Sequence, residues 1–160
     1  MKKIMFLVLV ILVLSGCSGK SLLIVSPTPD LCPVEEIQQF LEVADSAEHN
    51  FTQLAQQADM IPGEDLESII KEMQAIETEA KEITPPPCAV KAKSALTSYM
   101  ETLIQGYFRR YSQGIGITPQ ASINITTADD EFDLATSKHE YYEAQMEELR
   151  NIVLERSKSE

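Results

Sequence analysis

The chain contains few of the residues from which catalytic and metal sites are usually built. Only two histidines and three cysteines occur among 160 residues. The C-x-x-C-H segment that attaches c-type haem is missing. The G-x-S-x-G and H-E-x-x-H motifs and a phosphate-binding glycine loop are also missing. From these absences we predict that the protein is not an enzyme, and we assign no catalytic residue, no metal site and no cofactor.

Basic residues are scarce as well. Lysine and arginine number 13 against 25 acidic residues, which gives a formal net charge of -12. Residues 33–59 contain neither lysine nor arginine. A chain of this charge is repelled by phosphate groups, so we predict that it has no nucleic-acid partner.

No hydrophobic run is long enough to cross a bilayer, which takes about 20 residues in a helix. The longest run, from Ile4 to Leu14, has 11 residues. It follows two lysines, Lys2 and Lys3, and is followed by the small residues Ser15 and Gly16. A basic start, a short apolar stretch and a small-residue cleavage site are typical of an export signal.

Cys17 stands at the expected cleavage point, and Leu14-Ser15-Gly16-Cys17 resembles the lipobox of bacterial lipoproteins. The resemblance implies that residues 1–16 are a signal peptide and that the thiol of Cys17 carries diacylglycerol. It also implies at least two acyl chains, which anchor a protein durably. We therefore expect a lipid-anchored, extracytoplasmic protein on a bacterial membrane. The cell membrane and the outer membrane remain alternatives.

The mature chain left by this cleavage is large enough for one domain. We expect a flexible lipidated tether over residues 17–31 and a helical domain over residues 32–160. Loss of Lys2 and Lys3 leaves 11 basic against 25 acidic residues, a net charge near -14. The two remaining cysteines, Cys32 and Cys88, lie 56 residues apart, which is no metal-binding spacing. Outside the cytoplasm such a pair predicts a disulfide.

Apolar residues spaced three and four apart predict four amphipathic helices, at about residues 33–59, 64–83, 88–112 and 128–156. We identify no convincing β-strand. The third helix has apolar residues around more of its circumference than the others, so it should be the most buried. Short connections predict an all-α fold, an antiparallel up-down four-helix bundle. That arrangement would bring both Cys32 and Cys88 to one end of the bundle.

The charges of the predicted helices differ in sign. The third helix carries Lys91, Lys93, Arg109 and Arg110 against a single acid, whereas the other three helices are acidic. We interpret this as electrostatic support between helices. A binding role for the basic and aromatic segment 108–111 is the alternative.

One combination of residues could form a ligand site. His139 occupies an apolar-stripe position of the fourth helix, and Tyr99 and Tyr142 belong to the aromatic residues that gather on the third and fourth helices. Aromatic residues at helical spacing are typical of a core, so a hydrogen-bonded core histidine is the simpler interpretation. The alternative is an apolar pocket at Tyr99, His139 and Tyr142.

The sequence therefore leaves two functions in view. The leading expectation is a non-enzymatic lipid-anchored bundle that contacts another protein of the cell envelope. The alternative is a sensor or carrier module that binds a small ligand or haem between the third and fourth helices.

The lipobox resemblance predicts the effect of removing the lipidated thiol. Cys17→Ala should block processing or release the protein from the membrane fraction, because no acyl chain can then be attached. Fractionation and intact-mass measurement of the wild type and the variant check this. Normal processing and membrane attachment of the variant would show that the assignment as a lipid-anchored protein is wrong.

Overall fold

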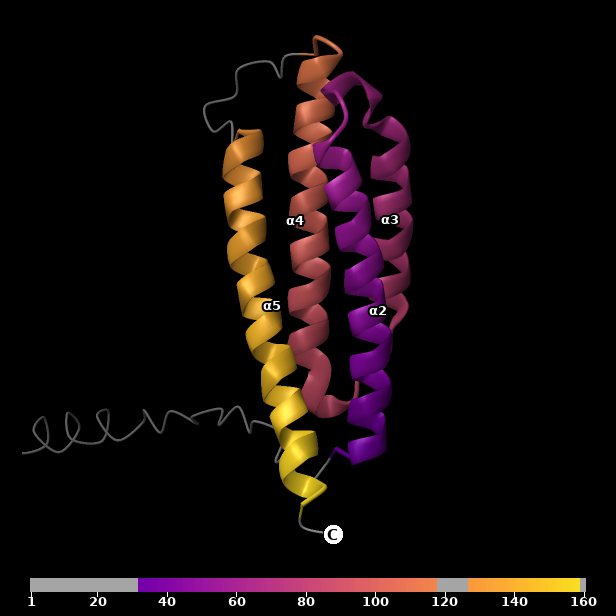
Figure 1. The fold of residues 1–160 in the computed structure, drawn as a ribbon, viewed down its shortest axis with the longest axis vertical. Coiled ribbons are helices and arrows are strands. Elements are labelled where there is room, and N and C mark those ends of the chain that lie inside the picture. The colour runs from indigo at the N-terminus through magenta and orange to yellow at the C-terminus, as the bar shows by residue number, and fades with distance from the viewer. Residues whose placement is uncertain (1–31, 118–126, 159–160) are drawn as a thin grey trace, which may run out of the picture.

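The computed structural model describes residues 32–117 and 127–158. These residues form four α-helices and no β-strand: α2 (Val34–Asp59), α3 (Glu67–Glu82), α4 (Val90–Gly114) and α5 (Ala128–Arg156). The four helices pack side by side along one long axis (Figure 1). The prediction of an all-α protein with four packed helices is confirmed. The predicted signal peptide, Cys17 and the predicted tether lie outside the described residues.

The helices begin and end close to the residues that local signals indicate. Pro33 precedes α2, and Thr127 precedes α5. The hydroxyl of Thr127 accepts from the backbone N–H of Asp130, whose carboxylate accepts from the backbone N–H of Thr127, a capping box. Among the described helices, none is long and apolar enough to span a bilayer.

Two predicted helix starts differ from the observed ones. Where we expected helices from residues 64 and 88, the chain first makes short 3-10 turns at Gly63–Asp65 and Pro87–Ala89. Each turn follows a proline with extended backbone, Pro62 or Pro86. Proline fixes its own φ and donates no hydrogen bond, so the chain tightens into a single turn before the α-helix begins.

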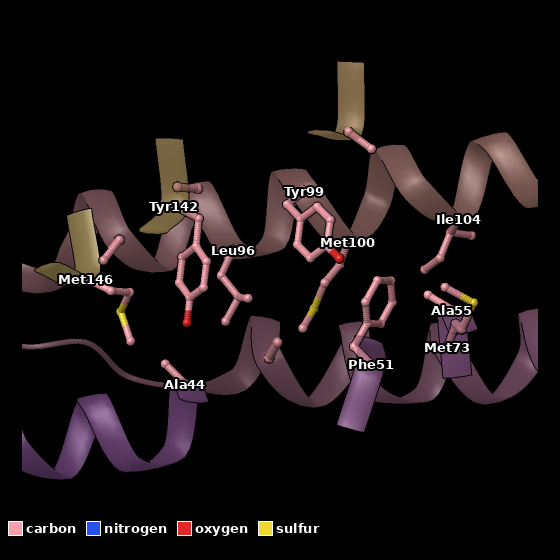
Figure 2. Packing of buried hydrophobic residues seen from close by; sticks show 14 of the residues in the cluster. Ala44, Phe51, Ala55, Met73, Leu96, Tyr99, Met100, Ile104, Tyr142 and Met146 are labelled. Atoms are coloured by element: carbon pink, nitrogen blue, oxygen red, sulfur yellow. The ribbon is translucent and has the colours of Figure 1, made fainter. Parts of the chain in front are cut away.

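The core runs along the bundle axis, and α4 is the most buried helix, as its sequence predicts. Figure 2 shows side chains from all four helices in one cluster, among them Phe51 of α2, Met73 of α3, Met100 of α4 and Met146 of α5. Each of these four side chains is inaccessible to water. Burying a side chain of this size stabilises the fold by about 1.5–3 kcal/mol.

At one end of the bundle, the connection between α2 and α3 lies directly on the last turn of α4. A Cβ atom on Gly114 would come 2.5 Å from the backbone nitrogen of Glu64, and one on Gly63 would come 2.8 Å from the carbonyl oxygen of Arg110. Backbone approaches backbone here, so only glycine fits at Gly63 and Gly114.

At the other end, Cys32 and Cys88 form the predicted disulfide, with their Cα atoms 6.1 Å apart. The backbone N–H of Cys88 donates to the sulfur of Cys32 over 3.0 Å. The guanidinium of Arg156 donates to the carbonyl oxygen of Cys32 over 2.6 Å. The starts of α2 and α4 and the end of α5 therefore meet at this disulfide.

The disulfide should make a large contribution to stability. Closing a loop of this length removes chain entropy from the unfolded state equivalent to about 4 kcal/mol. We expect Cys32→Ala, Cys88→Ala and the double variant to lower the thermal midpoint by similar amounts, and reduction of the wild type to do the same. Thermal unfolding followed by circular dichroism checks this. An unchanged midpoint after complete reduction would contradict it.

Candidate functional site

The structure brings together the three residues that the sequence marks as a possible site. The ring centroid of Tyr99 on α4 lies 4.6 Å from that of His139 on α5, which lies 6.2 Å from that of Tyr142. Tyr99 also makes an edge-to-face contact with Phe51 of α2, at 5.7 Å between centroids. Tyr142 is fully buried, whereas the side chain of His139 is 35% exposed. Figure 2 shows Tyr99 and Tyr142 in the core. With the partly exposed His139, the cluster extends from the core to the surface.

A fourth member, Glu48 of α2, was not predicted from the sequence. The imidazole Nε2 of His139 lies 3.1 Å from Oε1 of Glu48, and the hydroxyl of Thr52 donates to the same oxygen over 2.8 Å. Glu143, one turn further along α5, lies 3.8 Å from the imidazole. His139 therefore bridges α5 to α2. One carboxylate among 25 carries no recognisable signal in the sequence, because its partner lies 91 residues away.

The hydrogen bond between Glu48 and His139 favours the charged form of both groups. It lowers the pKa of Glu48 below its usual value, against the opposing effect of burial. It raises the pKa of His139, again against burial, with a smaller contribution from the charge of Glu48. The pair therefore behaves as an interhelical ion bridge over a range of mildly acidic pH.

Two buried tyrosines differ in what their hydroxyl groups contact. The hydroxyl of Tyr107 donates to the carbonyl oxygen of Ala55 or to the carboxylate of Asp59, at 2.9 and 2.8 Å. The hydroxyl of Tyr142 has no hydrogen-bond partner among the described residues. Burial raises the pKa of both phenols, so both stay neutral. The hydroxyl of Tyr107 therefore stabilises the contact between α4 and α2, whereas Tyr142 stabilises the core mainly by packing.

The basic segment 108–111 is used for contacts between helices. Arg109 lies 3.1 Å from the carboxylate of Glu131 on α5, and Arg110 donates to the carbonyl oxygen of Ile61 over 2.9 Å. The hydroxyl of Tyr111 donates to Glu67 of α3 over 3.2 Å. These contacts agree with the interpretation of electrostatic support. The side chain of Phe108 is half-exposed.

Three grooves of the described surface lie away from the Tyr99, His139 and Tyr142 cluster. The largest, about 500 Å³, lies between α2 and residues 83–87. A second, about 360 Å³, lies between α4 and α5, and a third, about 300 Å³, lies between α2 and α3. Tyr99, His139 and Tyr142 line none of the three. The described contacts of the cluster are contacts between its own side chains and with Phe51, Glu48, Thr52 and Glu143.

The arrangement can bind a proton and hold two helices together. Among the described residues, no three histidine, cysteine, aspartate or glutamate side chains are grouped so that they could hold a metal ion. His49, the other histidine, is exposed, and its Nε2 lies 2.9 Å from the side-chain nitrogen of Gln53. No protein-family model, curated protein or solved structure matches this chain.

The pKa shifts predict how the ion bridge depends on pH. The folded pKa of His139 is raised, so its stabilisation is complete below about pH 6.5 and is lost as the pH rises through the folded value. The folded pKa of Glu48 is lowered, so its stabilisation is present above about pH 4.5 and is lost as the pH falls through the folded value. Glu48→Gln should therefore destabilise the protein most near pH 5.5, by about 1 kcal/mol or less because the pair is partly exposed.

Urea unfolding at pH 5.5 and pH 9 measures this difference in free energy. Gln74→Ala, at an exposed position of α3, provides the control and should give the same small difference at both pH values, because it removes no titratable group. A Glu48→Gln effect that is equal at pH 5.5 and pH 9 would contradict the assignment.

The two tyrosines predict opposite effects of the same substitution. Tyr107→Phe removes a buried hydrogen bond and should cost about 1 kcal/mol of stability. Tyr142→Phe removes a buried hydroxyl that bonds to no described residue, so it should be neutral or stabilise the fold by up to about 1 kcal/mol. Free energies of unfolding of the two variants check this. A clear loss of stability for Tyr142→Phe would show that its hydroxyl is hydrogen-bonded in solution.

Proposed function

We propose that the protein is a lipid-anchored, extracytoplasmic helical bundle that acts without catalysis by contacting another protein of the cell envelope. The observation that carries the proposal is the disulfide between Cys32 and Cys88 in a chain whose third cysteine, Cys17, ends a lipobox-like segment. Disulfides persist outside the cytoplasm and are rare inside it. The disulfide and the lipobox-like segment therefore support an extracytoplasmic location independently of each other.

In this proposal, residues 1–16 are removed, Cys17 carries the lipid, and residues 17–31 form a flexible tether. The four helices alternate in direction along the bundle. Two contacts support that topology. The connection between α2 and α3 meets the end of α4 through Gly63 and Gly114, and the end of α5 meets the start of α2 through Arg156 and Cys32. The tethered end of the bundle is then the end that holds the disulfide.

The shape of the described domain favours contact with a partner over enclosure of a substrate. At 1.5 Å per residue, the longest helices offer side surfaces of about 40 Å. The grooves between them are shallow and open to solvent. Several large apolar side chains are about half exposed on different helices, among them Val43, Val90, Phe108, Leu134, Tyr141 and Leu154. The sensor or carrier alternative stays a prediction from the sequence, because none of the three grooves described above is lined by Tyr99, His139 or Tyr142.

Site-specific photocrosslinking in the native envelope tests this function. A photoreactive residue is placed singly at exposed positions on each helix of the full-length, lipid-anchored protein, for example at Gln39, Gln74, Ser94 and Glu140. We expect crosslinks to one envelope protein from neighbouring positions on one face, because a docked partner covers a contiguous surface. Mass spectrometry identifies the crosslinked protein.

The same positions in the Cys32→Ala, Cys88→Ala variant separate a folded contact surface from non-specific capture. A partner that binds the folded bundle should crosslink less to this destabilised variant. If no position on any helix crosslinks to a protein, the proposed function is wrong.

A further inference from the structure

The groove between α4 and α5 differs in chemistry from the other two. It has a volume of about 360 Å³ and is lined from α4 by Val90, Lys91, Ser94, Ala95 and Ser98, and from α5 by Lys138 and Tyr141. Two lysines line it and no carboxylate does. The other two grooves are lined by glutamates, Glu36 in one and Glu42 and Glu79 in the other.

The two lysines of this groove, Lys91 and Lys138, pair with no carboxylate in the part of the chain that the structure describes. By contrast, Lys71 and Lys81 each pair with a glutamate four residues earlier. In a chain with 25 acidic residues, two unpaired lysines in one groove form a local site of positive charge.

The ammonium group of Lys138 is held in place but not saturated. It donates one hydrogen bond, over 2.6 Å, to the hydroxyl of the buried residue Thr102. Thr102 in turn donates to the carbonyl oxygen of Ser98 on the groove wall. Because a lysine ammonium carries three donors, the remaining two are available to an anion.

The rest of the lining is apolar or bears hydroxyl groups. Val90 and Tyr141 are each 53% exposed, and the methyl group of the nearly buried Ala95 contributes to the floor. Ser94 and Ser98 add two hydroxyls. The groove therefore suits a ligand that presents a carboxylate beside an aliphatic or aromatic group.

We propose that this groove docks an acidic segment of the partner protein, with a carboxylate between Lys91 and Lys138 and an apolar side chain against Val90 and Tyr141. The inference rests on the proposed function and names the chemistry of the partner. Charge complementarity is the reason for the choice, because this groove combines unpaired cations with exposed apolar area. At physiological salt, charges more than about 8 Å apart are largely screened, so the acidity of the rest of the chain does not prevent local docking.

A protein segment fits the surroundings of the groove better than an anionic membrane does. Exposed acids lie on the same two helices, Glu101 on α4 and Glu140 and Glu148 on α5. Glu101 and Glu148 follow the groove residues Ser94 and Tyr141 by seven positions, so they share a helix face with them. A flat bilayer would meet these two carboxylates together with the groove, and repulsion would offset the attraction of two lysines. A narrow peptide segment touches the groove alone.

A defined peptide pair tests the proposal on the processed, lipid-anchored protein in neutral nanodiscs. The probe is the fluorescent peptide Leu-Asp-Phe-Glu-Leu, and its control is Leu-Asn-Phe-Gln-Leu. Fluorescence anisotropy should give measurable binding of the acidic peptide and at least five-fold weaker binding of the amide peptide. Lys91→Gln and Lys138→Gln should each weaken binding of the acidic peptide about three- to five-fold, the range expected for a partly exposed ion pair.

Lys71→Gln is the matched control, since it removes one positive charge from the far helix α3 and should leave peptide binding unchanged. Lys91→Gln carries the test if Lys138→Gln disturbs the fold, because the side chain of Lys91 is exposed and makes no described hydrogen bond. Equal binding of the two peptides, or no loss on Lys91→Gln, would overturn the proposal. If nanodiscs containing phosphatidylglycerol bound in a lysine-dependent manner and the peptide did not bind, the proposal would be overturned in favour of a lipid phosphate as the ligand.

Photocrosslinking separates failure of this inference from failure of the proposed function. A photoreactive residue at Ser94 in the full-length chain should capture the partner, and Lys91→Gln should reduce that capture. Crosslinks from other faces only would refute the groove and leave the proposed function standing. Crosslinks from none of the helices would refute both.

Discussion

The packing of α4 against its neighbours is the interaction on which the rest of the bundle depends. α4 contributes more buried side chains than any other described helix. It also receives the closest backbone approaches. A Cβ atom on Gly106 would lie 2.6 Å from the ring of Phe132 on α5, and Gly114 meets the connection between α2 and α3. Tyr107 adds a buried hydrogen bond to α2. Because α4 contacts all three neighbours, a change that shifts it along its axis would disturb its contacts with each of them.

Ion pairs stabilise this arrangement, but they involve only part of the positive charge of α4. Near the C-terminal end of α4, Arg109 and Arg110 pair with Glu131 and Asp59 of neighbouring helices. Near its start, Lys93 donates to the carbonyl oxygen of Lys81. The positive charge of α4 is thus compensated at one end and not at the other. The uncompensated end is the one that borders the groove between α4 and α5.

The contact between α2 and α5 combines core packing with polar bridges. Polar bridges cross it along its length: Asp45 with Arg150 at 2.8 Å, Glu48 with His139 at 3.1 Å, and the carbonyl oxygen of Cys32 with Arg156 at 2.6 Å. Partly exposed bridges are individually weak and sensitive to salt and pH. The stability of this interface should therefore respond to the salt concentration and the pH of the medium.

The sequence by itself determined the features that depend on neighbouring residues. Helix periodicity, the capping box at Thr127 and Asp130 and the interruption at residues 85–87 are local, and the four helices follow from them. The disulfide could also be predicted, because only Cys32 and Cys88 remain once Cys17 is assigned to lipidation. Only the tertiary structure decided which side chains meet across helices. The pairing of Glu48 with His139, the close approach of Gly63 and Gly114, and the unpaired state of Lys91 and Lys138 depend on how each helix is rotated and shifted against its neighbours. Burial of the whole core sets those rotations, and no short stretch of sequence contains that information.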